Sequence, residues 1–183
     1  SGGAGLNLGY LRAMEFWAKY NRKDGKLPFD VINAHRYCGK SKDKKGLTNY
    51  VDVNTDERGD TSDKVYVGVS PEEGDIVGSF DPIREWRDRY HPELEIWLTE
   101  FGWDTNQDYR TATSAHAYAE YTGRQVQAMW LVREYLLLSS IGIEMAAMYM
   151  SRDCGPEATA VGKYGSSGLI RYPIEISPTN VIQ

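Results

Sequence analysis

The sequence has few cysteines and no long apolar run. With only Cys38 and Cys154, at most one disulfide bridge can form, and we expect two free thiols. No apolar stretch reaches the roughly 18 residues of a membrane-spanning helix. The glycine-rich start, residues 1–5, also lacks the basic and apolar regions of a signal peptide. A disulfide scaffold and a membrane partner are therefore not expected.

The charge pattern and the missing glycine motifs exclude further classes of partner. The formal net charge is -5, and the 26% of charged residues mix both signs along the chain. Such a surface offers no broad cationic face to nucleic acid. Neither a Gly-x-Gly-x-x-Gly step nor a phosphate-binding Gly-x-x-x-x-Gly-Lys-Ser/Thr motif occurs. We expect no nucleic-acid partner, no cofactor and no metal.

The apolar residues predict a single domain, 1–183, of alternating helices and strands. Of the 183 residues, 41% are hydrophobic, which is enough for one sizeable core. Helical or strand-like spacing appears in six segments, with helices over 8–20, 81–90 and 118–140 and strands over 29–37, 95–100 and 143–150. We expect a long inserted loop at 39–80, with a short alternating piece at 64–69, and an irregular C-terminal segment at 154–183.

Polar side chains follow the apolar part of each predicted strand. This order of elements predicts an α/β fold with a parallel sheet. A (β/α)8 barrel needs this polarity, because its site lies at the carboxyl ends of its strands, and a doubly wound open sheet shares it.

Two strand ends carry the most specific motifs. The run 96–103, Ile-Trp-Leu-Thr-Glu-Phe-Gly-Trp, resembles the seventh strand of clan A glycoside hydrolases, and 33–37, Asn-Ala-His-Arg-Tyr, resembles the sixth. On this mapping 145–153 is the eighth strand. The resemblance covers nearly the whole chain and implies the C-terminal part of a (β/α)8 TIM barrel, incomplete as given.

The resemblance implies a retaining glycosidase that acts on a polysaccharide or oligosaccharide. Glu100 would be its nucleophilic carboxylate. A hydrogen bond from Tyr37 or His35 would favour the ionised form of Glu100. The family also suggests an extracellular or periplasmic location.

Other residues near the strand ends are candidates for binding the sugar. Trp103 and Tyr149 could cover the apolar face of a pyranose. Arg36, Arg152 and Asp153 could bind its hydroxyl groups.

One departure from the family is important. Clan A enzymes take their acid/base residue from an Asn-Glu pair that ends strand four, and no Asn-Glu dipeptide occurs here. Only about three of eight strands are predicted, whereas a barrel has about 250 residues. The resemblance therefore implies a missing N-terminal half, from the same parent chain or from a partner chain.

Alternative interpretations stay open. The chain could be a non-catalytic carbohydrate-binding or structural subunit, or an unrelated α/β enzyme with Glu100 as a general base. Glu100 could pair with a cation such as Arg152, and Arg152 could pair with Asp153 at the surface. Trp103 could anchor a loop, and we expect Trp17 in the core.

Overall fold

The computed structural model describes residues 6–43, 48–49, 64–106, 114–155 and 164–172. A central parallel sheet has the strand order β1-β5-β6, with β1 at Val31–His35, β5 at Glu95–Glu100 and β6 at Met145–Ala146. The helices are α1 (Leu8–Asn21), α2 (Ile76–Tyr90) and α3 (Gly123–Ser140). A second, antiparallel sheet has the order β3-β2-β4, with β2 at Gly39–Asp43, β3 at Thr48–Asn49 and β4 at Lys64–Gly68.

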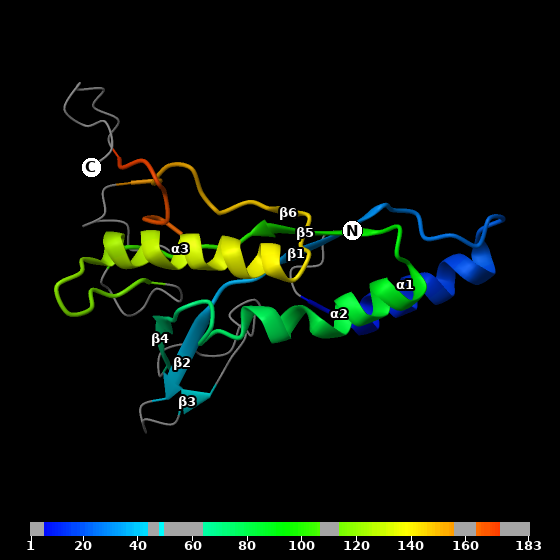
Figure 1. Ribbon diagram of the computed structural model, residues 1–183, viewed down its shortest axis with the longest axis horizontal. Coiled ribbons are helices and arrows are strands. Elements are labelled where there is room, and N and C mark those ends of the chain that lie inside the picture. The colour runs from blue at the N-terminus through cyan, green and yellow to red at the C-terminus, as the bar shows by residue number, and fades with distance from the viewer. Residues whose placement is uncertain (1–5, 44–47, 50–63, 107–113, 156–163, 173–183) are drawn as a thin grey trace.

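Helices and parallel strands alternate, which confirms the predicted α/β class. The strands of the central sheet are neighbours in chain order, and α2 and α3 make the crossovers between them. Helix α2 packs against both α1 and α3. Figure 1 shows the second sheet extending away from the central one. Within the described residues the central sheet has three strands and does not close into a barrel.

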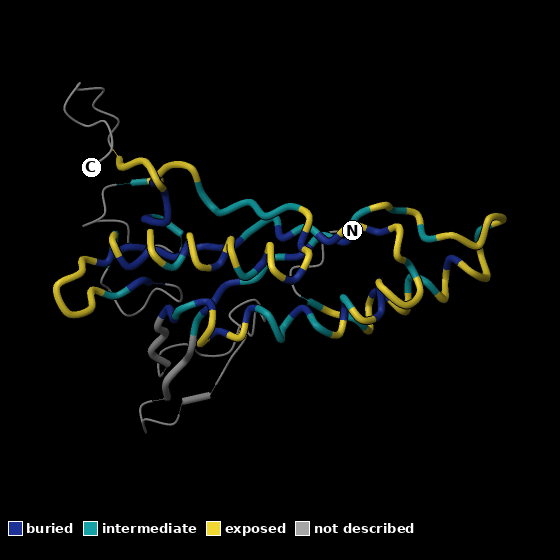
Figure 2. The backbone as a smooth tube through the Cα atoms, viewed as in Figure 1, coloured by how far each residue is buried: buried dark blue, intermediate teal, exposed yellow. Residues whose placement is uncertain are grey.

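Local signals explain where the helices begin and end. The Asn7 side chain caps α1 by accepting a hydrogen bond from the Tyr10 N–H at 3.0 Å. A capping box of Thr122 and Gln125 begins α3. Helix α3 ends at Ser140, and Gly142 follows it with a φ of 73°, a conformation that suits glycine. Figure 2 shows that α3 is buried along one side and exposed along the other.

An irregularity in the pairing of β1 with β5 sets the direction of Glu100. Ala34 pairs with Leu98, but His35 pairs with Glu100, so Thr99 is an extra residue on β5. Side chains alternate between the faces of a strand, and one extra residue reverses the alternation. Glu100 consequently does not lie on the buried face of the sheet with Leu98. It lies on the same face as His35.

The opposite ends of the strands are occupied by structural contacts. Arg87 of α2 donates to Glu144 at 2.9 Å and to the Leu94 carbonyl at 3.0 Å. The second carboxylate oxygen of Glu144 accepts from the Ile96 N–H at 2.8 Å. These contacts join α2 to the amino-terminal edge of the sheet, whereas Glu100 lies at the carboxyl edge.

Several element boundaries differ from the predicted ones. The expected loop 39–80 contains the second sheet and the start of α2. That helix begins at Ile76 because Asp75 caps it, with its carboxylate accepting from the Gly78 N–H at 3.2 Å. Strand β6 covers only part of 143–150, and α3 begins at 123 rather than 118. In the described part of 154–183, an isolated bridge joins Ile170 to Arg152.

Two further expectations concern side chains and membranes. Both cysteines are free, as predicted. Trp17 is 56% exposed, so its predicted place in the core is wrong: α1 buries Leu11 and Ala18 instead. Among the described helices, none is long and apolar enough to cross a membrane.

Replacing Gly102 with alanine will destabilise the fold near Glu100. Gly102 has a φ of 139°, and an added Cβ would lie 2.9 Å from the Tyr149 carbonyl oxygen. We expect a loss of about 1–3 kcal/mol in the free energy of unfolding, measured by urea denaturation. Gly155→Ala is the control, since its Cβ would meet no described atom within 4 Å. Equal stability of the two variants would contradict the close approach at Gly102.

Candidate functional site

The carboxylate of Glu100 lies between two side chains from the end of β1. The Tyr37 hydroxyl donates to Glu100 Oε2 at 3.1 Å, and His35 Nδ1 lies 3.4 Å from the same oxygen. The side chains of His35 and Glu100 are 28% and 33% exposed, whereas Tyr37 is only 2% exposed. The structure thus brings together the three residues that the motifs single out.

The two oxygens of Glu100 have different surroundings. Both contacts from β1 reach Oε2. Within the described part of the chain, Oε1 has no hydrogen-bond partner, although the side chain is partly open to solvent. One oxygen therefore accepts a hydrogen bond from Tyr37 and lies near His35, while the other makes neither contact.

Tyr37 is suited to act as a neutral donor. Burial raises the pKa of Tyr37 above its ordinary value, and the nearby Tyr164 and Glu100 raise it further. The hydroxyl consequently keeps its proton around neutral pH. That proton can be donated to the carboxylate of Glu100.

Tyr164 extends this group of aromatic side chains. Its ring centroid lies 4.7 Å from that of Tyr37 and 5.5 Å from that of Tyr149. Burial is also the main cause that raises the pKa of Tyr164. Sequence reasoning missed this residue, because it belongs to a segment without periodic apolar residues. Tyr149, a predicted sugar platform, is half-buried at the edge of this group.

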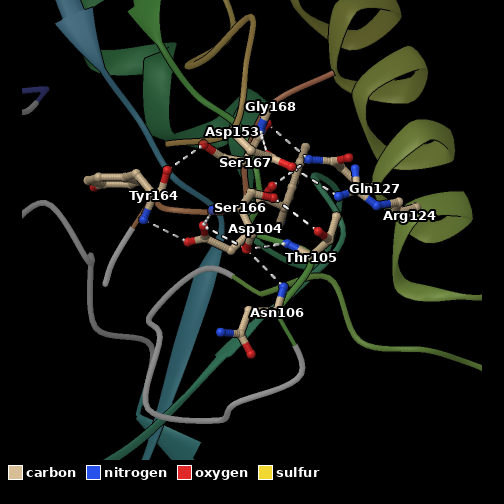
Figure 3. Close-up of polar contacts among 11 residues, drawn as sticks. Asp104, Thr105, Asn106, Arg124, Gln127, Asp153, Tyr164, Ser166, Ser167 and Gly168 are labelled. Carbon is tan, nitrogen blue, oxygen red and sulfur yellow. Dashed lines mark hydrogen bonds and ion pairs between the residues drawn. The ribbon is translucent and has the colours of Figure 1, made fainter. Parts of the chain in front are cut away.

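Asp104, also missed, holds the segment that carries Tyr164. The carboxylate is fully buried and accepts from the Tyr164 and Ser166 N–H groups, both at 3.0 Å (Figure 3). Thr105 adds a backbone hydrogen bond to the Ser166 carbonyl at 3.0 Å. In the sequence, only its position four residues after Glu100 indicated that Asp104 lies near the site.

Asp153 is buried and makes contacts inside the protein, whereas the sequence predicted that it would bind sugar. It is 1% exposed, and it accepts from the Gly168 N–H at 2.8 Å and from Arg124 of α3 at 3.0 Å (Figure 3). Its ion-pair partner is therefore Arg124, not the neighbouring Arg152. Both oxygens are used inside the protein, which leaves Asp153 poorly suited to bind substrate.

Trp103 cannot be the sugar platform that its position suggested. It is fully buried, and its indole N–H donates to the Val69 carbonyl at 2.9 Å. Gln127 of α3 donates to the Trp103 carbonyl at 2.6 Å. Trp103 is therefore a loop anchor, the alternative that the sequence left open.

The two predicted arginines also lie away from the Glu100 carboxylate contacts. Arg36 alternates with His35 and Tyr37 on the strand end, and its guanidinium donates to the Gly74 carbonyl at 2.8 Å. Arg152 is exposed, and its backbone bridges to Ile170. The Glu100 carboxylate is contacted by Tyr37 and His35, so the hypothesis of a Glu100–Arg152 pair finds no support among the described residues.

Arg36 instead faces a buried carboxyl group on α3. Glu134 is 1% exposed, and neither of its oxygens has a hydrogen-bond partner among the described residues. Burial raises the pKa of Glu134 well above its ordinary value, Arg36 opposes this rise, and Glu72 adds to it. Glu134 therefore favours its protonated, neutral form.

Known proteins add no functional information. Comparisons with protein-family models, with curated proteins and with solved structures gave no match for this chain. Within the described residues, no group of three or more His, Cys, Asp or Glu side chains could hold a metal ion.

Replacing Glu134 with glutamine will stabilise the protein increasingly as the pH rises. A carboxyl group with a raised folded-state pKa binds more protons in the native than in the unfolded state, so native stability falls above about pH 4.3. Glutamine cannot ionise. We expect Glu134→Gln to gain on the order of 1 kcal/mol or more at pH 7 and little at pH 4, measured by urea unfolding.

The matched control for this prediction is Glu120→Gln, at an exposed position. Its stability should follow the unsubstituted protein across the same pH series. A Glu134→Gln curve parallel to that of the control would contradict a neutral buried Glu134.

Proposed function

We propose that this chain is the C-terminal part of a (β/α)8 barrel of a retaining glycoside hydrolase, with Glu100 as the nucleophile. The observation that carries the proposal is the environment of the Glu100 carboxylate. It lies at the carboxyl end of a parallel strand, its side chain is 33% exposed, and Oε2 is contacted by Tyr37 and His35 whereas Oε1 is not.

The arrangement suits a double displacement. Glu100 Oε1 attacks the anomeric carbon while the bond from that carbon to the leaving-group oxygen breaks, and the leaving group takes a proton from an acid. Water, deprotonated by the same group acting as a base, then attacks the anomeric carbon and releases Glu100 as a carboxylate. Hydrogen bonding from Tyr37 to Oε2 favours the ionised nucleophile.

The acid/base residue would come from the remaining part of the barrel. Retaining enzymes place their two carboxyl groups about 5–5.5 Å apart. Asp104 and Asp153 are occupied by backbone N–H groups and, for Asp153, by Arg124. Neither is suited to transfer a proton to a substrate, so the proposal requires further strands that carry such a group.

Two surface features support a larger barrel. Strands β1 and β6 are the edges of the parallel sheet, and sheets of this kind are usually covered and extended on both sides. Helix α1 exposes Phe16, Trp17 and Tyr20. Exposed aromatic side chains at this density are typical of an interface.

Covalent labelling will test the nucleophile directly. The protein and its variants are produced together with any chain that accompanies the protein in its source, and they are incubated with activated 2-deoxy-2-fluoro glycosides of several common sugars. Peptide mapping by mass spectrometry should find one fluoroglycosyl group on Glu100. Tyr37→Phe should slow labelling about 10-fold to 100-fold, the range expected for a hydrogen bond to a charged group.

The controls separate nucleophilic attack from general reactivity. Glu100→Gln should abolish labelling, whereas Glu93→Gln, at an exposed position on the loop before β5, should leave it unchanged. Labelling at another carboxylate would contradict the role of Glu100. A folded protein that binds sugar but never labels would favour the non-catalytic carbohydrate-binding subunit.

A further inference from the structure

Strand pairing reaches His35, and Tyr37 lies beyond it. The parallel ladder between β1 and β5 ends at the pair of His35 and Glu100. One more backbone hydrogen bond follows, from the Arg36 N–H to the Glu100 carbonyl at 3.0 Å. Tyr37 comes after this bond, and its hydroxyl still reaches Glu100 Oε2 at 3.1 Å. The position of Tyr37 therefore depends on the contacts that hold the chain just beyond β1.

The turn that precedes α2 holds the chain at this point. The Arg36 guanidinium donates to the Gly74 carbonyl at 2.8 Å, and the Val69 N–H donates to the Cys38 carbonyl at 3.1 Å. Gly74 also lies close against Cys38, since a Cβ added to Gly74 would be 2.6 Å from the Cys38 Cβ. Tyr37 consequently lies between two residues that are both anchored.

The turn itself, residues 70–74, is fixed within the fold. Its backbone is closed by a hydrogen bond from the Gly74 N–H to the Ser70 carbonyl at 2.8 Å. Arg133 of α3 contacts both carboxylate oxygens of Glu72, at 2.8 and 2.6 Å, and a paired contact of this kind favours one orientation. The chain then continues directly into α2. The Gly74 carbonyl is therefore a fixed acceptor that is joined to two helices.

Arg36 is suited to use this acceptor. Side chains alternate along an extended chain, so Arg36 points away from the side on which His35 and Tyr37 contact Glu100. A guanidinium keeps its charge across the working pH range, and a hydrogen bond from a charged donor is stronger than one between neutral groups. Gly74 is buried, which limits competition from water for its carbonyl.

We propose that Arg36 is a positioning residue of the candidate site: its hydrogen bond to the Gly74 carbonyl fixes the chain beyond β1. The Tyr37 hydroxyl thereby stays within hydrogen-bond distance of Glu100 Oε2. The inference rests on the proposed role of Glu100 as the nucleophile. The motif placed Arg36 among the sugar-binding residues, whereas here it acts through Tyr37 and touches no substrate.

NMR tests this inference without any sugar. The chemical shift of the Glu100 carboxyl carbon is measured at pH 7 in protein labelled with 13C at the glutamate carboxyl groups, and Glu100→Gln identifies the signal. Tyr37→Phe removes the donor and gives the full shift. Arg36→Met keeps a long side chain without a hydrogen-bond donor, and we expect a smaller shift in the same direction. Arg36→Lys restores a donor and should recover part of the original position.

The double variant decides whether Arg36 acts through Tyr37. In a Tyr37→Phe background, Arg36→Met should cause little further shift, because the hydroxyl that Arg36 positions is absent. Arg89→Met, at an exposed position on α2, is the control and should leave the signal in place. An unmoved signal in Arg36→Met, an equal shift in both backgrounds, or no recovery in Arg36→Lys would overturn the inference.

The rate of fluoroglycoside labelling separates this inference from the proposed function. Arg36→Met should slow labelling of Glu100 about 2-fold to 10-fold, less than Tyr37→Phe, since the Tyr37 hydroxyl is displaced rather than absent. If the NMR shifts follow the expected pattern while Glu100 never labels in the unsubstituted protein, the hydrolase function fails but the positioning role stands. If Glu100 labels equally fast in Arg36→Met, the positioning role fails alone.

A measurement on the unsubstituted protein applies if Arg36→Met fails to fold. Rotation of the arginine guanidinium groups is followed in 15N spectra of their side-chain nitrogens. The two Arg36 Nη atoms should give separate signals, because one of them is bound to the Gly74 carbonyl. The exposed Arg12 should give one averaged signal. An averaged signal from Arg36 would mean that its guanidinium is not held, and it would overturn the inference.

Discussion

The parallel pairing of β1 with β5, with Thr99 as an extra residue, is the constraint on which the site depends. Regular alternation would leave Glu100 on the face of Ile96 and Leu98, which are fully buried. The extra residue turns it toward His35 and Tyr37 instead. The Thr99 hydroxyl donates to the Asn33 side chain at 2.7 Å, which ties the irregularity to β1.

Two buried carboxylates, Asp104 and Asp153, support the segment next to this site. Asp104 and Asp153 each accept backbone N–H groups of the segment 164–168. A buried carboxylate is costly unless it is hydrogen-bonded, so these contacts stabilise one conformation of the segment strongly. Arg124 links Asp153 to α3, and Gln127 links the same helix to the Trp103 and Ser167 carbonyls. The helix after β5 thereby holds both the loop beyond Glu100 and the segment of Tyr164.

Much of the fold could be predicted from the spacing of apolar residues. The contact of Glu100 with His35 and Tyr37 could be predicted from the two motifs. The apolar spacing of α1, the apolar run of β5 and the glycine after α3 are local signals. Each of them predicted its element correctly. His35, Tyr37 and Glu100 lie at the carboxyl ends of two adjacent strands. Parallel pairing of these strands was therefore enough to predict that the three side chains lie close together. The second sheet was missed because its strands lie in a polar segment whose pairing is not local.

The two predicted site residues that the structure buries, Asp153 and Trp103, share a cause. Asp153 and Trp103 were read as site residues because they follow strands, but burial and hydrogen bonding depend on what packs against them. Arg36 sits between two site residues, and alternation directs it to the other face. Tyr164 could not be found by local pattern, because contacts with residues distant in sequence, Asp104 and Asp153 among them, hold its segment in place.

The central claim is that the Tyr37 hydroxyl proton is directed at Glu100. Neutron diffraction from a deuterium-exchanged crystal locates that proton directly. The account predicts the deuteron of Tyr37 on the line between its oxygen and Glu100 Oε2. A Tyr37 deuteron that points away from Glu100 would leave Oε2 without this donor and would contradict the account.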